Sequence, residues 1–341
     1  MNRLIALSLA LLAAAPCFSQ ADNAPGFRLG LVTDVGGIDD ASFNQTVWEG
    51  LLRFAAYRGS PSVEPPSYLQ SSSQSDYLPN LAAFADQGMD LVVAPGFLFA
   101  EAIPAAAAAH PRTRFLIIDE PAYGPNIASV VFKEHEGSFL AGVAAGLRAR
   151  ADGKRVVGFV GGMKFPLIQK FQAGFEQGVR AVLPGARILV EYAAGFADSD
   201  EGRRIARGMY DRGAWVIFHA AGWTGNGIIM EAKARAEAGD KRWVIGVDRD
   251  QRPDGAYGYG ETVILTSMIK RVDVAAYLVA GMAMDGEFPG GRILELGIKE
   301  GGVGLPAFNP DLDDAMMAEI DAWAARIASG EIVVAAAPRG N

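Results

Sequence analysis

The chain has 341 residues, a formal net charge of −8, a single cysteine and three histidines. An acidic chain without a Lys/Arg cluster is not typical of nucleic-acid-binding proteins, so we expect no nucleic-acid partner. One cysteine is too few for a disulfide framework or a cysteine-ligated metal site. The length suits two α/β lobes better than one small core.

The first 21 residues are typical of a secretory signal peptide. Arg3 provides a positive start, residues 4–15 form an apolar run too short to span a bilayer, and small residues precede a cleavage predicted near Ala21. An alternative is that Cys17 becomes a lipidated first residue, although Pro16 fits poorly before a lipidated cysteine. We expect export to the periplasm with cleavage rather than lipidation.

After the signal peptide, short β-rich runs alternate with helical patterns in a βαβ order. The predicted strands are residues 27–34, 68–70, 91–95, 114–119, 127–132, 155–161, 187–192, 215–221, 243–248, 263–267 and 293–298. The predicted helices are residues 45–58, 77–87, 99–109, 139–150, 168–182, 201–212, 227–238, 272–284 and 311–328. Several strands are apolar on both faces, as in parallel sheets covered by helices.

Two successive βα series predict an α/β protein with two doubly wound parallel sheets joined by crossover segments. Residues 133–137 are the first predicted crossover, and the Gly/Pro-rich loop 248–260 is the second. A third falls in residues 286–291 or 301–306. These boundaries assign residues 27–132 and about 250–285 to lobe 1, residues 133–249 and about 286–330 to lobe 2, and residues 331–341 to a tail.

The segment FRLGLVTDVGGIDDASFNQTVWEG, residues 27–50, carries the first candidate site. A short apolar strand ends at Asp34, glycines make a tight turn, and a polar cluster that includes Asp39, Asp40 and Asn44 opens a helix. Polar side chains at this place in an α/β sheet can hold a ligand. They can equally form an ordinary N-cap, because Asp and Ser satisfy the free amide groups of a helix start.

The sequence contains few of the residue patterns that are typical of catalytic sites. His110, His135 and His219 are widely separated, without the HExxH spacing of a zinc site. No GxSxG nucleophile motif occurs, and the glycine-rich stretch 222–227 matches neither dinucleotide-binding nor P-loop patterns. We therefore expect a binding protein, with no catalytic residues, metal or cofactor.

A binding site can be assembled from residues at predicted strand ends. Asp119 ends one strand, Asp248 ends another, and Gly222 with Trp223 follows a third. Carboxylates accept hydrogen bonds from hydroxyl or heterocyclic N–H groups. The alternative is that both aspartates only cap the elements that follow them.

Aromatic residues lie close to these strand ends in the sequence. Phe43, Trp48, Phe196 and Trp223 could stack on a flat ring, although Phe43 and Trp48 could instead be core residues on a helix face. Lys270, after an apolar strand, could reach a ligand hydroxyl or lie on the surface.

These segments together resemble the basic membrane protein family of substrate-binding proteins, of the purine-nucleoside-receptor type. The matching motifs are GGIDDASFNQ at 36–45 with WEG at 48–50, SFLAGVAA at 138–145, VGFVGG at 157–162, FQAGF at 171–175, AGWTGNG at 221–227, IGVDRDQ at 245–251 and TSMIK at 266–270. The resemblance implies a type I two-lobed periplasmic-binding-protein fold that delivers a small ligand to an inner-membrane ABC permease. We expect a monomer.

The resemblance also implies roles for single residues. Asp39 and Asp119 would contact the base of a nucleoside, and Asp248 and Lys270 would hold its ribose. Asp39 stands where the family usually has Asn, and an ionised Asp only accepts hydrogen bonds. Trp223 stands where a small residue is expected. Riboflavin or another heterocycle is an alternative ligand, and a sensor is an alternative to an import component.

Overall fold

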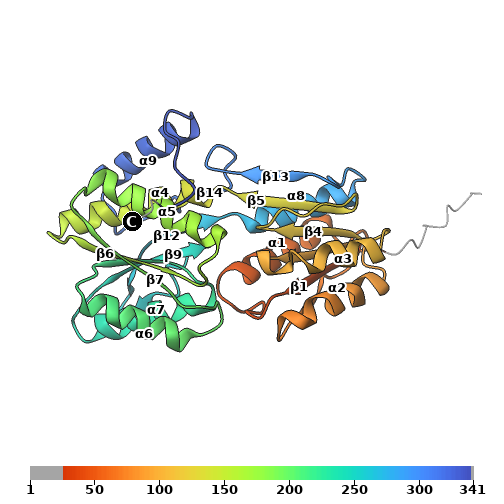
Figure 1. Ribbon diagram of the computed structural model, residues 1–341, viewed down its shortest axis with the longest axis horizontal. Coiled ribbons are helices and arrows are strands. Elements are labelled where there is room, and N and C mark those ends of the chain that lie inside the picture. The colour runs from red at the N-terminus through yellow and green to blue at the C-terminus, as the bar shows by residue number, and fades with distance from the viewer. Residues whose placement is uncertain (1–25, 339–341) are drawn as a thin grey trace, which may run out of the picture.

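The computed structural model describes residues 26–338, which form two α/β lobes, each built on a six-stranded sheet (Figure 1). This arrangement confirms the predicted fold class. The signal peptide with its cleavage near Ala21, the alternative lipidation site Cys17 and the last three residues of the tail lie outside the described residues. Within residues 26–338, no helix is both long and apolar enough to cross a membrane.

Lobe 1 contains a sheet in the order β2-β1-β3-β4-β5-β13, with all neighbouring strands parallel. Its strands are β1 (Leu29–Thr33), β2 (Ser67–Gln70), β3 (Leu91–Pro95), β4 (Arg114–Ile118), β5 (Ile127–Phe132) and β13 (Ile293–Leu296). Helices α1 (Phe43–Arg58) and α8 (Val272–Met284) cover one face, and α2 (Tyr77–Asp86) and α3 (Ala102–Ala109) cover the other. Helical cover on both faces explains why the central strands are apolar along their whole length.

Lobe 2 contains a sheet in the order β14-β12-β9-β8-β6-β7, parallel except for the edge pair β12 and β14. Its strands are β6 (Val156–Gly161), β7 (Arg187–Tyr192), β8 (Val216–Ala220), β9 (Trp243–Asp248), β12 (Ile264–Lys270) and β14 (Val303–Gly304). Helices α4 (Glu134–Ala151) and α5 (Pro166–Val182) cover one face, and α6 (Ser199–Asp211) and α7 (Trp223–Glu237) cover the other. Helix α9 (Asp314–Ala328) packs against α4.

Helices α4 and α5 pack unusually closely because glycines lie at their contact. A Cβ atom at Gly142 would collide with the carbonyl oxygen of Phe175, and one at Gly178 would collide with that of Phe139. A larger residue at either position would therefore force the two helices apart. The close packing holds the first turns of both helices, which border the space between the lobes, in a fixed relation.

Three segments connect the lobes, between β5 and α4, between β12 and α8, and between β13 and β14. The first lies at Lys133, inside the segment predicted to cross. The predicted boundaries were wrong in two places. Strand β12 was assigned to lobe 1 but pairs with β9 in lobe 2, and β13 was assigned to lobe 2 but pairs with β5 in lobe 1.

The error at β12 arose from the Gly/Pro-rich segment 248–260, which was predicted to cross between the lobes. Residues 249–263 instead make a local excursion that contains the short strands β10 (Ala256–Tyr257) and β11 (Glu261–Thr262). The backbone N–H of Gln251 donates to Ser267 Oγ at 3.0 Å, so the loop is fastened to β12 of the same lobe. A high Gly/Pro content indicates turns but does not determine which sheet the chain joins next.

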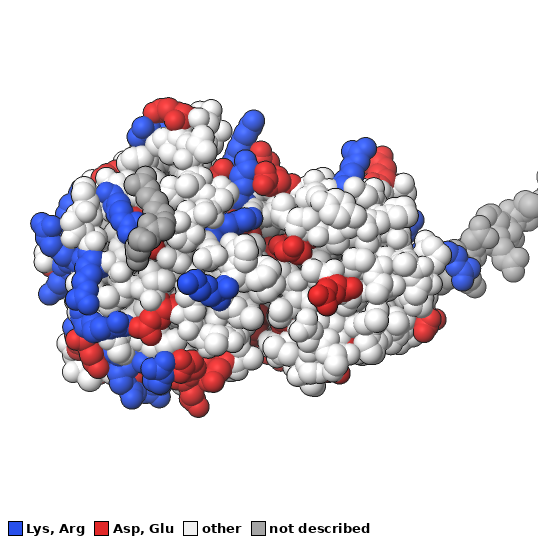
Figure 2. Space-filling view, viewed as in Figure 1, with Lys and Arg blue, Asp and Glu red and all other residues white. Residues whose placement is uncertain are grey.

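Basic side chains on the face shown in Figure 2 gather over lobe 2, at the left of the view. Lobe 2 contains a group in which Glu231 of α7, a buried residue, pairs with Arg203 and Arg207 of α6 and with Arg235, each at 3.2 Å. Each of these arginines therefore has a carboxylate partner within the lobe.

Candidate functional site

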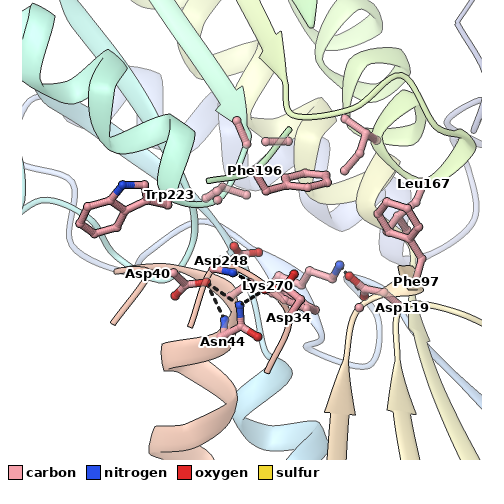
Figure 3. Close-up of a pocket in the computed structure, with 18 of the residues that line it drawn as sticks. Asp34, Asp40, Asn44, Phe97, Asp119, Leu167, Phe196, Trp223, Asp248 and Lys270 are labelled. Carbon is pink, nitrogen blue, oxygen red and sulfur yellow. Dashed lines mark hydrogen bonds and ion pairs between the residues drawn. The ribbon is translucent and has the colours of Figure 1, made fainter. Parts of the chain in front are cut away.

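A cavity with about 640 Å³ of empty space, part of it open to solvent, lies between the lobes (Figure 3). It lies where the loops after parallel strands of both sheets face each other, which is the usual place for a ligand in α/β proteins. Eight of the ten predicted site residues line it: Phe43, Asn44, Asp119, Phe196, Gly222, Trp223, Asp248 and Lys270.

The start of helix α1 forms part of the lobe 1 wall. The carboxylate of Asp40, buried and lining the cavity, accepts hydrogen bonds from the backbone N–H groups of Ser42 at 2.9 Å, Asn44 at 2.9 Å and Gln45 at 3.1 Å. It thus satisfies the amide groups left free at the helix start. Burial raises the pKa of Asp40, and these N–H donors act in the opposite direction.

Asn44 connects two carboxylates of this wall, as the dashed lines in Figure 3 mark. Its Nδ2 donates to Asp34 Oδ1 at 2.8 Å and to Asp40 Oδ2 at 3.0 Å. Its Oδ1 is buried and accepts no hydrogen bond from any described residue. A buried polar atom without a partner is costly, so this oxygen is a candidate acceptor for a ligand N–H or O–H group.

Asp39 does not line the cavity, contrary to the prediction. It is exposed and lies in an outer hollow with Gln70, Ala197 and Trp223. The backbone turns after it, because Ala41 adopts φ 52°, a left-handed conformation that is uncommon for alanine. The turn places the neighbouring Asp40, rather than Asp39, at the helix start and in the cavity wall.

Trp48 is also absent from the residues that line the cavity. It is half-buried on α1, where its ring meets the ring of Tyr68 edge-on with 5.4 Å between the centroids. It packs against the lobe 1 core on the side of the helix that faces β2. The structure therefore supports the alternative that Trp48 is a core residue.

Lys270, the last residue of β12, links the two lobes. Its side chain is 1% exposed, and its ammonium nitrogen lies 2.5 Å from Asp119 Oδ1 of lobe 1 and 3.1 Å from Glu134 Oε1. Both carboxylate oxygens are buried, and the ammonium group of Lys270 is the cation that offsets their desolvation. Burial disfavours the charge of Lys270, but the surrounding carboxylates raise its pKa, so the lysine is protonated at pH 7.

Burial raises the pKa of Asp119 to about 6, and the nearby Lys270 limits this rise. Asp119 follows β4 with φ 81°, and Asp248 is the last residue of β9 with φ 69°. These left-handed conformations at non-glycine residues are strained, and such strain is often found at functional sites. At pH 7, Asp119 is mainly ionised and can accept hydrogen bonds.

Asp248 faces Asp119 from the second sheet. Its Oδ2 accepts a hydrogen bond from Ser42 Oγ of lobe 1 at 2.5 Å. Burial raises the pKa of Asp248 to about 7, against the opposing effects of Lys270 and of this hydrogen bond. The carboxyl group therefore changes protonation near neutral pH, and a ligand hydroxyl would find a strong acceptor once it is ionised.

Aromatic rings form the apolar side of the cavity. Phe97 of lobe 1 stacks on Phe165 of lobe 2 with 4.3 Å between centroids and 11° between planes, and it meets Phe196 edge-on at 6.1 Å. Phe196 lies across the cavity from the Asp34–Asn44 group (Figure 3). Trp223 is 40% exposed and lines both the cavity and two outer hollows, so it stands at the cavity mouth.

Several hydrogen bonds hold the loop before α1 against lobe 2. The carbonyl oxygen of Ala41 accepts from Arg249 Nε at 2.8 Å and from Gln251 Nε2 at 3.1 Å, and that of Asp40 accepts from Asn226 Nδ2 at 3.2 Å. The two lobes are thus in direct contact beside the cavity. These contacts fix the turn that brings Asp40 to the site.

Sequence reasoning missed several residues of the site, among them Asp34, Asp40, Phe97 and Phe171. Asp34 and Asp40 lie in the segment 27–50, where the available signals were a strand end at Asp34 and a helix start near Asp40. Phe97 and Phe171 carried no such signal, because an isolated aromatic residue is most often part of a core. Glu134, which contacts Lys270, was likewise not singled out.

The histidines do not line the cavity. His219 of β8 is fully buried, and burial lowers its pKa to about 4, so it is neutral at pH 7. It packs against α7 where Gly225 leaves room for the imidazole ring. Among residues 26–338, no cluster of three or more His, Cys, Asp or Glu side chains has an arrangement suited to a metal ion.

Two parallel-dominated sheets with three connecting segments, and a cavity between them lined by carboxylates and aromatic rings, define the class of type I substrate-binding proteins. The structure closely matches an ABC transporter solute-binding protein from Aeropyrum pernix, with a TM-score of 0.80 and 26% identity over 92% of this chain and 94% of the other. A protein from Conexibacter woesei of the same description matches with a TM-score of 0.70 over 91% and 99% of the two chains, at 24% identity.

The sequence places the chain within one family. Residues 27–337 match the Bmp family, described as ABC transporter substrate-binding protein PnrA-like. The chain is 40% identical, over 99% of both sequences, to the CD4+ T-cell-stimulating antigen of Listeria monocytogenes. It is 37% identical to the ABC transporter nucleoside-binding protein BmpA of Lactococcus lactis, over 85% of this chain and 84% of the relative. The chain therefore belongs to this family of non-catalytic substrate-binding proteins, as the resemblance indicated.

Proposed function

We propose that this chain is the periplasmic receptor of an ABC importer and that it binds a nucleoside, with a purine base favoured, in the cavity between the lobes. The observation that carries the proposal is the group formed by Lys270, Asp119 and Asp248. It brings two carboxylates and one ammonium group from both sheets to one point beside aromatic rings. The relative from Lactococcus lactis, which is named a nucleoside-binding protein, supports the same ligand class.

The chemistry of this group suits the vicinal hydroxyls of a ribose. Each hydroxyl can donate to a carboxylate oxygen of Asp119 or Asp248 and accept from the ammonium group of Lys270. Hydrogen bonds that involve a charged partner are the stronger ones and contribute about 1.5–3 kcal/mol each.

The base would lie against the aromatic side of the cavity, near Phe196 and Phe97. Offset stacking is worth about 0.5–1.5 kcal/mol beyond the burial of the rings. Asn44 Oδ1 on the opposite wall is available to accept from an N–H group of the base. Trp223 at the mouth would shield the bound ligand from solvent.

The charge of the cavity favours a nucleoside over a nucleotide. Among the described residues that line it, the ionisable groups are four aspartates and one lysine: Asp34, Asp40, Asp119, Asp248 and Lys270. The lysine is already paired with Asp119 and Glu134. A phosphate group would therefore meet an excess of negative charge without a free cation to bind it.

Mass spectrometry of ligand released from protein purified without refolding tests the proposal most directly. We expect a purine nucleoside. Calorimetric titration with adenosine, guanosine, inosine, cytidine, uridine, riboflavin and guanosine monophosphate then ranks the candidates. Binding of riboflavin alone, or of the nucleotide as tightly as guanosine, would contradict the proposed ligand class.

The importer role has a separate test. Deletion of the gene in the native organism should reduce uptake of the radiolabelled nucleoside, and restoring the gene should recover it. Normal uptake in the deletion strain, together with a changed transcriptional response to the nucleoside, would indicate a sensor. Sedimentation velocity should give the mass of a monomer.

A further inference from the structure

Glu134 is a buried carboxylate that lies behind the cavity rather than in its lining. It is the first residue of α4, directly after the crossover residue Lys133, and its side chain is 0% exposed. Its Oε1 lies 3.1 Å from the ammonium nitrogen of Lys270, and its Oε2 lies 3.2 Å from that of Lys170. A fully buried carboxylate between two lysines needs both of them to offset its desolvation.

The surroundings of Lys270 define where its ammonium group can go. Asp119 and Glu134 lie within 3.1 Å of the nitrogen, and three aromatic rings, those of Phe43, Phe132 and Phe171, lie with their centroids 5.2–5.4 Å from it. An ammonium group has three N–H donors. The two close carboxylates can accept from two of these donors, so one donor remains for a ligand.

Glu134 is itself held in place from the other side. Lys170 of α5, which pairs with Glu134 Oε2, also donates to the carbonyl oxygen of Phe132 at 3.3 Å, at the end of β5 in lobe 1. Glu134 is therefore fixed between a strand end of lobe 1 and a helix of lobe 2. It cannot turn towards the cavity without losing its pair with Lys170.

We infer that Glu134 is a positioning residue of the binding site, which holds the Lys270 ammonium group so that its remaining N–H is directed into the cavity. The identity of the bound molecule rests on the proposed function, but the arrangement of the two side chains does not. Because Glu134 starts α4 just after the first crossover, it also ties the direction of Lys270 to the connection between the lobes.

A double-mutant cycle with Glu134→Gln and Lys270→Met, titrated with guanosine and inosine, tests this inference. Glu134→Gln should lower the affinity about ten-fold or more, since it removes a charged hydrogen-bonding partner of the lysine. In the Lys270→Met background, the same change should alter the affinity by less than about two-fold, because residues that act through each other are not additive. If the loss of affinity in the double variant equals the product of the losses in the two single variants, the inference is overturned.

The matched control is Glu136→Gln, which neutralises a carboxylate in the same helical turn. Glu136 pairs with Lys133 at 3.6 Å and accepts from the backbone N–H of Ile298 at 2.9 Å, away from Lys270. Its change should leave the affinity within about two-fold of wild type. An equal loss for both variants would show that any lost charge at the start of α4 weakens binding, and would contradict a specific role of Glu134.

A measurement without ligand separates this inference from the proposed function. In ¹⁵N-lysine-labelled protein, Lys270→Met identifies the ammonium signal of the buried lysine by its loss. Glu134→Gln should shift or broaden this signal, whereas Glu136→Gln should not. An unchanged signal in Glu134→Gln overturns the inference even when nucleosides bind. A shifted signal in a protein that binds no nucleoside leaves the inference standing and rejects the proposed ligand.

Lys170→Met provides a second variant if Glu134→Gln fails to fold. The side chain of Lys170 is 29% exposed, so its loss is tolerated more easily than the loss of a fully buried charge. Removing it frees the outer oxygen of Glu134, which should shift the Lys270 signal and weaken guanosine binding several-fold. Neither effect would occur if Glu134 did not position the lysine.

Discussion

Replacing Asp248 by asparagine should make the ligand-free protein more stable at pH 8 while weakening its binding site. Asp248 is 6% exposed, and its Oδ2 accepts the hydrogen bond from Ser42 Oγ across the cavity. Asparagine preserves the shape of the side chain but carries no charge. The change therefore removes the cost of a buried carboxylate without opening a cavity in the core.

The magnitude follows from the pKa of the carboxyl group. Burial raises the pKa of Asp248 from 3.8 to about 7, so the folded protein binds a proton there more tightly than the unfolded chain does. The free energy of unfolding consequently falls as the pH rises from about 4 to 7. Between pH 5 and pH 7 this amounts to about two pH units at 1.36 kcal/mol each, or about 3 kcal/mol, and no further loss follows above pH 7.

Urea unfolding of wild type and Asp248→Asn at pH 5 and pH 8 provides the measurement. The free energy of unfolding of the variant, relative to wild type, should increase by about 3 kcal/mol between the two pH values. Asp321→Asn, at an exposed position of α9, is the control and should show little pH-dependent difference. If the difference between Asp248→Asn and wild type is the same at both pH values, the carboxyl group is not buried as described.

The same variant should bind a nucleoside more weakly. At pH 8 the ionised carboxylate of Asp248 is available to the ribose, and losing a charge-assisted hydrogen bond of about 1.5–3 kcal/mol lowers the affinity about ten- to a hundred-fold. Calorimetric titration with guanosine at pH 8 decides this. Affinity equal to that of wild type would leave Asp248 as a loop cap without a ligand contact.

Further predictions concern base choice, lobe closure and helix packing. Asp39→Asn should leave the ranking of nucleosides in a thermal-shift panel unchanged, because Asp39 lies outside the cavity; a reordered ranking would refute this placement. Phe97→Ala removes the stack on Phe165 between the lobes, worth about 0.5–1.5 kcal/mol, and should weaken ligand binding about two- to ten-fold. Small-angle scattering should show a larger radius of gyration for this ligand-free variant than for wild type. Identical radii would count against a role of Phe97 in holding the two lobes together. Gly178→Ala should destabilise the protein by more than about 2 kcal/mol, whereas Gly208→Ala, with open space at its Cβ in α6, should stabilise it by up to about 1 kcal/mol; similar thermal midpoints for both would contradict the packing of α4 on α5.

The sequence alone determined most of the elements and three central residues of the site. Apolar runs bounded by polar residues located the ends of β4 and β9 to within one residue, whereas the end of β12 was placed at residue 267, three residues before Lys270. They therefore predicted places near strand ends for Asp119, Asp248 and Lys270. This inference succeeded because strand ends are encoded locally, and because the carboxyl ends of parallel strands meet at one edge of a sheet. The motifs that carry the family resemblance lie in the same local segments.

The tertiary structure decided which residues turn into the cavity and which sheet each strand joins. Asp39 and Asp40 are neighbours with the same chemistry, yet one is exposed and the other is buried, because lobe 2 holds the turn at Ala41 through Arg249. Strand β12 has an apolar pattern that suits either sheet, and only its pairing with β9 assigns it to lobe 2. Contacts of this kind join residues that are separated in the chain, so no local pattern of residues encodes them, and they form only in the folded tertiary structure.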